Sequence, residues 1–171
     1  MDPQLDGLTK LYNRHYLQTL GASLCEQAQA DDRLLGLIFA DIDGMKTVDD
    51  FLGCPAGDRL IVRFAQIIQS HLHGGAVAGR IGGDEFLVIA PVRSEAELAA
   101  LAEAIREEAK TVVVMGGSYD EVSSDPVTLT LGLSCLPHHG SNLKSLWIAA
   151  ERASDYGKHS GKDRVCWSEA V

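Results

Sequence analysis

The spacing of apolar residues changes along the chain, and each change predicts a new element of secondary structure. Between positions 17 and 28, Leu and Ala recur at the interval of an amphipathic helix. The unbroken apolar run 34–40 is typical of a buried strand, and residues 60–72 again place apolar side chains on one helical face. We expect this second helix to end at the His73-Gly74-Gly75 segment.

Two short apolar runs, 77–81 and 86–90, flank a Gly-Gly-Asp turn in the middle of the chain. The pattern is typical of an antiparallel β-hairpin, in which glycine fills the turn positions that need a positive φ. Ser94 and Glu97 form a capping-box pattern, which predicts the start of a third helix. The hairpin is therefore expected to lie between two long helices.

The last third of the chain predicts two strands, a helix and a final short strand, at 112–114, 127–133, Leu143 to Gly157 or Gly161, and 164–167. The complete order, with both strands at 112–114 and 127–133 counted, is then α-β-α-β-β-α-β-β-α-β. Helices and strands that interleave around a central hairpin indicate an α+β fold, with helices packed on a mainly antiparallel sheet.

The length and composition of the chain are those of one globular unit. Its 171 residues are 46% hydrophobic, so we expect residues 1–171 to form a single domain with a real core. The longest apolar runs fall far short of the roughly 20 residues that a membrane-spanning helix needs. The N-terminus lacks the basic and apolar regions of a secretory signal, so a soluble, cytoplasmic protein is expected.

Charge and cysteine content exclude some classes of function. The net charge of −9 has the wrong sign for a protein that holds duplex nucleic acid by its phosphates. A polyphosphate ligand would need a divalent cation or a few well-placed lysines to reverse the field locally. The four cysteines are scattered without a Cys-x-x-Cys pair, which disfavours a structural zinc site or a redox motif.

Two acidic pairs stand at the ends of predicted strands, Asp41 with Asp43 and Asp84 with Glu85. Carboxylates beside a buried run are costly unless they are paired or bind a metal. Either pair alone could consist of solvated turn residues. Together they favour Mg²⁺, because this ion takes hard oxygen ligands and often needs only one or two protein carboxylates. Only Asp41 is securely placed on its strand.

These residues carry a resemblance to a known family. The Gly-Gly-Asp-Glu-Phe segment at 82–86 resembles the signature of the GGDEF domains, the diguanylate cyclases. Other motifs of the family follow in the expected order: 6–14, 41–46, Gly57-Asp58, Arg80, 128–132 and 161–165. The resemblance covers about residues 5–166. It implies a polymerase-palm-like, ferredoxin-like α+β fold with a βααββαβ core.

The resemblance also implies a metal site and a catalytic group. Mg²⁺, with Mn²⁺ as an alternative, would be held by Asp41, the backbone carbonyl of Ile42, and Asp84. Glu85 would assist at the metal or act as a base. Lys46 would stabilise the charge that builds on the phosphates.

The implied substrate is GTP. The residues that would bind it are Gly44, Met45, Lys46, Asp49, Cys54, Asp58, Gly82, Gly83, Lys158 and Lys162. Two subunits would face each other as a homodimer, so that the 3′-hydroxyl of one GTP attacks the α-phosphate of the other. The products would be cyclic di-GMP and pyrophosphate. A regulatory module fused or bound to this domain would control the reaction.

Without the family context, a lysine near a helix end, such as Lys158, more often only complements the helix dipole.

Several positions depart from the family pattern. Asp49 replaces an asparagine that reads guanine, and an ionised carboxylate can only accept hydrogen bonds. Cys54 replaces a histidine, and Ser154-Asp155 replaces Leu-Tyr.

These departures leave two alternatives to an active cyclase open. One is a silent domain that binds GTP or only a protein partner and acts as a regulator. The other is a cyclase with relaxed base choice, which rests on Asp49 alone. A further difference concerns regulation, because residues 73–76 replace the Arg-x-x-Asp of the family's product-binding site. Without that guanidinium and carboxylate, no product inhibition is expected at this site.

Overall fold

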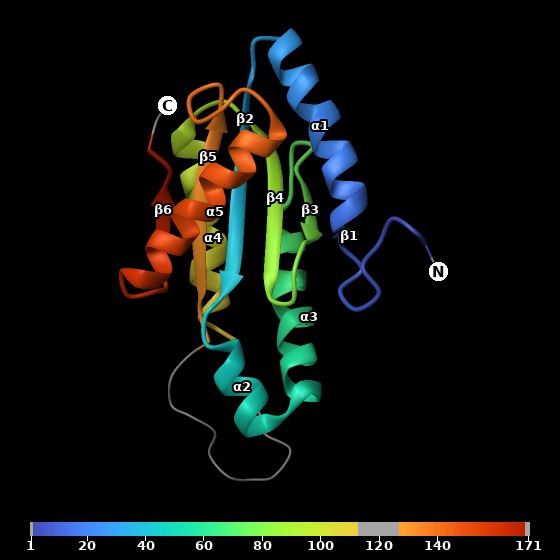
Figure 1. Cartoon of the computed structure of the whole chain (residues 1–171), viewed down its shortest axis with the longest axis vertical. Helices are drawn as coiled ribbons and strands as arrows, with labels where there is room; N and C mark the ends of the chain where they lie inside the picture. Colours follow the sequence, from blue (N-terminus) through green and yellow to red (C-terminus); the bar gives the residue numbers. More distant parts are fainter. Residues whose placement is uncertain (1, 113–126, 170–171) are drawn as a thin grey trace.

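A computed structural model describes residues 2–112 and 127–169 of the chain. Within them the elements are β1 (Tyr12–Asn13), α1 (Arg14–Ala30), β2 (Leu34–Ile42), α2 (Met45–Leu52), α3 (Cys54–His71), β3 (Val77–Arg80), β4 (Glu85–Val92), α4 (Glu95–Ala109), β5 (Leu129–Leu136), α5 (Leu143–His159) and β6 (Val165–Trp167). The run from β2 to β5 is the βααββαβ core that the family resemblance implied (Figure 1).

The strands form one mixed sheet in the order β1-β3-β4-β2-β5-β6. The three inner pairs, β3 with β4, β4 with β2, and β2 with β5, are antiparallel. The two edge strands, β1 and β6, pair in parallel with their neighbours. The α+β class with a mainly antiparallel centre is therefore confirmed.

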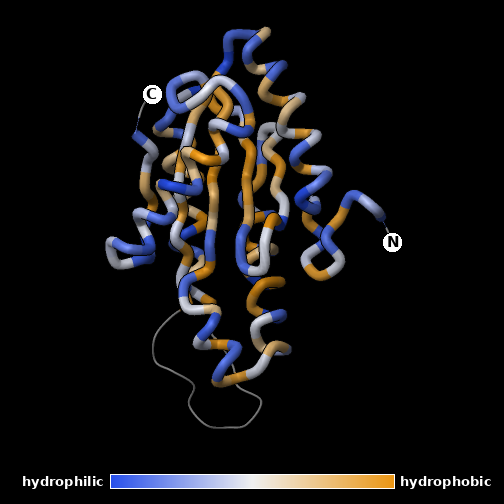
Figure 2. The backbone as a smooth tube through the Cα atoms, in the orientation of Figure 1, coloured by the Kyte–Doolittle hydropathy of each residue, from blue (hydrophilic) through white to orange (hydrophobic). Residues whose placement is uncertain are grey.

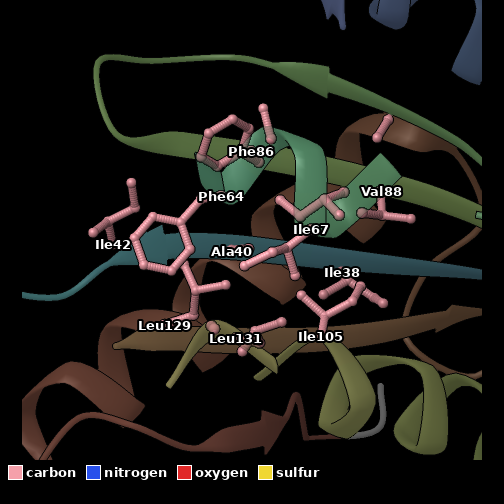
Figure 3. Packing of buried hydrophobic residues seen from close by; sticks show 14 of the residues in the cluster. Ile38, Ala40, Ile42, Phe64, Ile67, Phe86, Val88, Ile105, Leu129 and Leu131 are labelled. Carbon is pink, nitrogen blue, oxygen red and sulfur yellow. The ribbon is translucent and has the colours of Figure 1, made fainter. Parts of the chain in front are cut away.

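Side chains of the central strands alternate between two apolar layers, as the period of a strand requires. Ile38 and Ala40 of β2 face α3 and α4, where they pack with residues such as Phe64 (Figure 3). Leu37 and Phe39 belong to the opposite layer, which α1 and α5 cover. The strands are apolar and the outer helices carry the polar positions (Figure 2). The result is a three-layer arrangement of helix, sheet and helix.

Three details of the predicted elements differ in the structure. The helix expected over residues 60–72 is α3, and a separate helix, α2, precedes it, divided from it at Gly53, which has a φ of 78° and is closely followed by Pro55. Strand β1 was missed because two residues carry no periodic signal. In the predicted strand 112–114, Val112 lies outside any strand, and residues 113 and 114 lie outside the described residues.

The helix starts follow the capping chemistry of the sequence. Asn13 accepts a hydrogen bond from the Tyr16 amide at the start of α1. Ser94 does the same for the Glu97 amide, so the predicted start of the third helix is confirmed. The Glu97 carboxylate accepts a hydrogen bond from the amide of Arg93 instead of completing the capping box at Ser94.

In the part of the chain that the structure describes, none of the helices is both long and apolar enough to cross a membrane.

Candidate functional site

The two predicted acidic pairs lie at one end of the sheet, where β2 ends and β4 begins (Figure 1). Asp41 is directly opposite Glu85 in the antiparallel pairing of the two strands. The amide of Ile42 donates to the carbonyl oxygen of Asp84 over 3.2 Å. The order of the strands therefore places Asp41, Asp84 and Glu85 side by side, although 43 positions separate Asp41 from Asp84 (84 − 41).

The charges in this group repel one another. Burial raises the pKa of Asp41, and the carboxylates of Asp84 and Asp43 add to the effect while Lys158 opposes it. Burial also raises the pKa of Glu85, with Asp41 and Asp84 as further causes. A partly buried cluster of like charges with raised pKa values is an arrangement that binds a cation.

A lysine from the last turn of α5 supplies such a cation. The ammonium nitrogen of Lys158 lies 2.6 Å from Oδ1 of Asp41 and 2.9 Å from the carbonyl oxygen of Ile42. It lies 3.0 Å from Oδ1 of Asp43. Lys158 therefore does more than complement the helix dipole. Its ammonium binds two of the oxygens that were predicted to hold a metal.

Asp43 has a different role from that of Asp41. Its side chain is buried and accepts hydrogen bonds from the hydroxyls of Thr128 and Thr130, at 2.7 and 2.8 Å. The amide of Asp163 donates to Oδ2 over 3.1 Å. Burial alone would raise the pKa of Asp43, but these bonds and Lys158 hold it below its usual value. Asp43 is thus an anchor that joins β2, β5 and the loop after α5.

This anchor was missed by sequence reasoning. The available signal was the pair Thr128 and Thr130, which flank one apolar residue and so lie on the same buried face of the strand. Buried polar side chains of this kind need a hydrogen-bond partner. No local pattern shows that the partner is Asp43, which lies 85 and 87 positions earlier in the chain.

The β3–β4 turn differs from the predicted hairpin turn. Neither Gly82 nor Gly83 has a φ in the left-handed region, so the expected reason for glycine at these positions is wrong. A Cβ at Gly82 would overlap the carboxylate of Glu85, so any other residue there would force the Glu85 side chain to move. Gly83 is exposed, and a Cβ there would meet nothing within 4 Å. Its backbone is therefore open to a ligand.

Arg80 holds this turn to the N-terminal segment. Its Nε and Nη2 donate to the carbonyl oxygen of Gly83 over 3.1 and 2.7 Å, and its Nη1 lies 3.4 Å from Oδ1 of Asp6. The same Asp6 oxygen accepts from the amide and hydroxyl of Thr9. The conformation of the turn is thus coupled to the segment that precedes β1.

The remaining predicted substrate residues lie on α2, at the start of α3, and after α5. Gly44 precedes α2 with a φ of 82°, and Met45 is buried beneath that helix. Exposed side chains follow at Lys46, Asp49, Cys54 and Asp58. The Asp49 carboxylate packs against Gly57, where a Cβ would overlap it. Lys162 is exposed, and its side chain forms no hydrogen bond or ion pair within residues 2–112 and 127–169.

Whether a metal suits the site can be judged from its donor atoms. Among the described residues, no three His, Cys, Asp or Glu side chains converge as a ready metal cage. The Asp41 carboxylate and Ile42 carbonyl nevertheless bind a cation already, in the form of the Lys158 ammonium. Oxygen donors of this kind fit Mg²⁺, which commonly takes one or two carboxylates and completes its shell with phosphate and water.

Comparisons with known proteins show which family the chain resembles. The family model described as "Diguanylate cyclase, GGDEF domain" matches residues 4–164. The chain is 32% identical over 167 residues to MucR of Pseudomonas aeruginosa, a bifunctional diguanylate cyclase/cyclic di-GMP phosphodiesterase. It is 33% identical over 165 residues to the uncharacterized protein YhcK of Bacillus subtilis. The matches cover 96% of the chain but only 23% and 45% of those two proteins.

A solved structure extends the likeness to the fold. The GGDEF domain of DgcB from Caulobacter crescentus, crystallised in complex with c-di-GMP, superposes with a TM-score of 0.90 at 28% identity. The superposition covers 98% of this chain and 96% of that one. With motifs, strand order and family model in agreement over nearly the whole length, the chain belongs to the GGDEF domain family of diguanylate cyclases.

Proposed function

We propose that this domain is a Mg²⁺-dependent diguanylate cyclase that condenses two GTP molecules to cyclic di-GMP and pyrophosphate. The observation that carries the proposal is the cation-binding pair of oxygens from Asp41 and Ile42, with Asp84 and Glu85 beside it. The family of the chain and the names of MucR and DgcB support the same reaction.

In this proposal each polar group has a distinct task. Asp41, the Ile42 carbonyl and Asp84 would hold the metal, which would supply positive charge against the phosphates. Glu85, whose pKa is raised, ligates with them or accepts the proton of the attacking 3′-hydroxyl. The open backbone at Gly83 lets the phosphates approach.

Three further groups bind the nucleotide. Lys46 binds the phosphates, together with the amides of Gly44 and Met45. Asp58 accepts hydrogen bonds from the guanine, and Asp49 and Cys54 complete that pocket on α2 and α3. Lys158 and Lys162 contact the terminal phosphates. Two such domains must face each other, because each site carries only one of the two GTP molecules that react.

We also propose that the enzyme lacks product inhibition at residues 73–76. The amide of Ala76 donates to the carbonyl of His73 over 3.0 Å, and Gly74 and Gly75 both have positive φ values. The segment is therefore a tight turn between α3 and β3. It offers no guanidinium for a phosphorylated dinucleotide.

The test is incubation of the purified chain with Mg²⁺ and GTP at increasing protein concentration, with chromatographic identification of the product. Cyclic di-GMP should form, and the rate per molecule should rise with concentration because two sites must meet. Asp84→Ala should abolish turnover. Asp50→Ala is the matched control, because Asp50 is an exposed acid of α2 outside the predicted site.

A silent GTP-binding domain is the second candidate. It is favoured by the Asp49 and Cys54 replacements, and by the ammonium of Lys158 on the predicted metal ligands. GTP binding without any cyclic di-GMP at high protein concentration would select this candidate over the cyclase.

A further inference from the structure

The ammonium of Lys158 is fully coordinated by the site. A lysine ammonium has three N–H donors, and three acceptors surround this one: Oδ1 of Asp41, the carbonyl oxygen of Ile42 and Oδ1 of Asp43. The side chain is 18% exposed, so the charge is largely removed from water. Within the site, Lys158 has the position and the oxygen ligands of a bound cation.

A metal ion at these oxygens would compete with the ammonium. Mg²⁺ binds oxygen at about 2.1 Å and demands near-ideal octahedral geometry. The lone pairs of Asp41 Oδ1 and the Ile42 carbonyl that face the site already accept from Lys158 at 2.6 and 2.9 Å. A divalent ion bound there would also repel the ammonium at close range. Binding of the metal and binding of Lys158 to these oxygens therefore oppose each other.

We infer that Lys158 is an internal competitor of the metal, which keeps metal affinity low until a nucleotide draws the ammonium away. The identity of the metal and the nucleotide rests on the proposed function. A triphosphate offers Lys158 stronger acceptors, and the flexible four-carbon stem lets the ammonium move to them. Release of Asp41 and Ile42 then opens the metal site. Nucleotide and metal therefore bind with positive coupling, and each raises the affinity of the other equally.

The Asp43 carboxylate keeps its position during this exchange. It is held by Thr128, Thr130 and the Asp163 amide, so it stays in place when Lys158 moves. The ammonium can keep its contact with Asp43 while it leaves Asp41 and Ile42. This explains why Asp43 is buried beside the site without serving as a metal ligand.

The test measures Mn²⁺ binding without nucleotide, by electron paramagnetic resonance of the free ion. Lys158→Gln should bind Mn²⁺ at least about tenfold more tightly than the wild type, since the competing charge is gone. Lys144→Gln removes the same charge from an exposed position of α5 outside the predicted site and should leave Mn²⁺ affinity within about twofold of wild type. Adding Asp41→Asn to Lys158→Gln should abolish the gain, which would locate the ion at this site.

Unchanged or weaker Mn²⁺ binding by Lys158→Gln would overturn the inference, as would an equal gain in Lys144→Gln. If the substitution destabilises the fold, Mn²⁺ binding can still be followed by the melting temperature of each variant with and without the ion. Mn²⁺ should then raise the melting temperature of Lys158→Gln and have little effect on the wild type. A wild-type chain that Mn²⁺ stabilises as strongly would contradict the competition.

This experiment is independent of turnover. A chain that makes no cyclic di-GMP but gains Mn²⁺ affinity in Lys158→Gln would refute the cyclase proposal alone. A chain that makes cyclic di-GMP and shows no such gain would refute the competition alone.

Discussion

The hydroxyl of Thr130 donates to Oδ1 of Asp43 over 2.8 Å in the buried layer between β2 and β5. Thr128 and the Asp163 amide complete the shell of this carboxylate. The carboxylate in turn is one of the three ligands of the Lys158 ammonium. The architecture of the site therefore depends on a residue that was not among the predicted metal or substrate ligands.

Asp43→Asn should cost about 3 kcal/mol of unfolding free energy, because it removes one partner of a buried, hydrogen-bonded charge pair. Urea unfolding followed by circular dichroism measures the loss. Asp50→Asn is the control, since this exposed residue should change stability by no more than about 0.5 kcal/mol. Equal urea midpoints for Asp43→Asn and wild type would show that the anchor contributes nothing.

Glu85→Gln should stabilise the nucleotide-free chain at pH 7 by roughly 0.5–1 kcal/mol while reducing activity. The pKa of Glu85 is raised in the folded state, so its ionisation opposes folding above that pKa. The advantage of the variant should shrink as the pH falls through the folded pKa and disappear below the ordinary value of 4.5. Urea midpoints at pH 7 and under acid conditions test both signs.

The pH dependence of Asp43 should run in the opposite direction. Its folded pKa lies below the ordinary value of 3.8, so its contribution to stability is complete above that pH. It is lost as the pH falls through the lower, folded value. The difference in stability between wild type and Asp43→Asn should therefore be constant near neutrality and vanish only in strong acid. A difference that fades already between pH 7 and pH 5 would contradict the lowered pKa.

Gly82→Ala and Gly83→Ala should separate the structural and ligand-binding roles of the turn. A methyl group at Gly82 overlaps the Glu85 carboxylate and should displace it from Asp41, so this variant should lose turnover with only a small change in melting temperature. A methyl group at Gly83 meets open space, so this variant should melt like the wild type and lose GTP affinity instead. Turnover assays and nucleotide titrations distinguish them, and full turnover by Gly82→Ala would refute the displacement of Glu85.

Thiol labelling should report on the guanine pocket. Burial raises the pKa values of Cys25 and Cys135 to about 11, so these thiols should react slowly at pH 8. Cys54 is exposed and should react first, as mass spectrometry of the labelled peptide can show. GTP should slow its labelling if Cys54 lines the pocket. Cys54→Ser is the control, and fast labelling that GTP leaves unchanged would remove Cys54 from the site.

The local pattern of residues specifies most elements and the family of this chain. Periodicities of two and 3.6 report which face of a strand or helix is buried, and this information lies within a few neighbouring positions. They predicted β2, the hairpin and the long helices. They missed β1, which is too short for a period, and the α2–α3 break, which depends on one glycine conformation. The acidic group at 41, 84 and 85 was also recognisable, because its motif is contiguous on each strand.

The tertiary structure alone placed Lys158 on Asp41, 117 positions away, and Asp43 beneath Thr128 and Thr130. These contacts depend on β2 lying between β4 and β5, with α5 packed across the sheet. The packing of distant elements decides which oxygens the Lys158 side chain reaches. The spacing of residues along the chain does not predict this contact. The motif therefore locates the predicted ligands along the chain, whereas the fold determines that Lys158 contacts two of them.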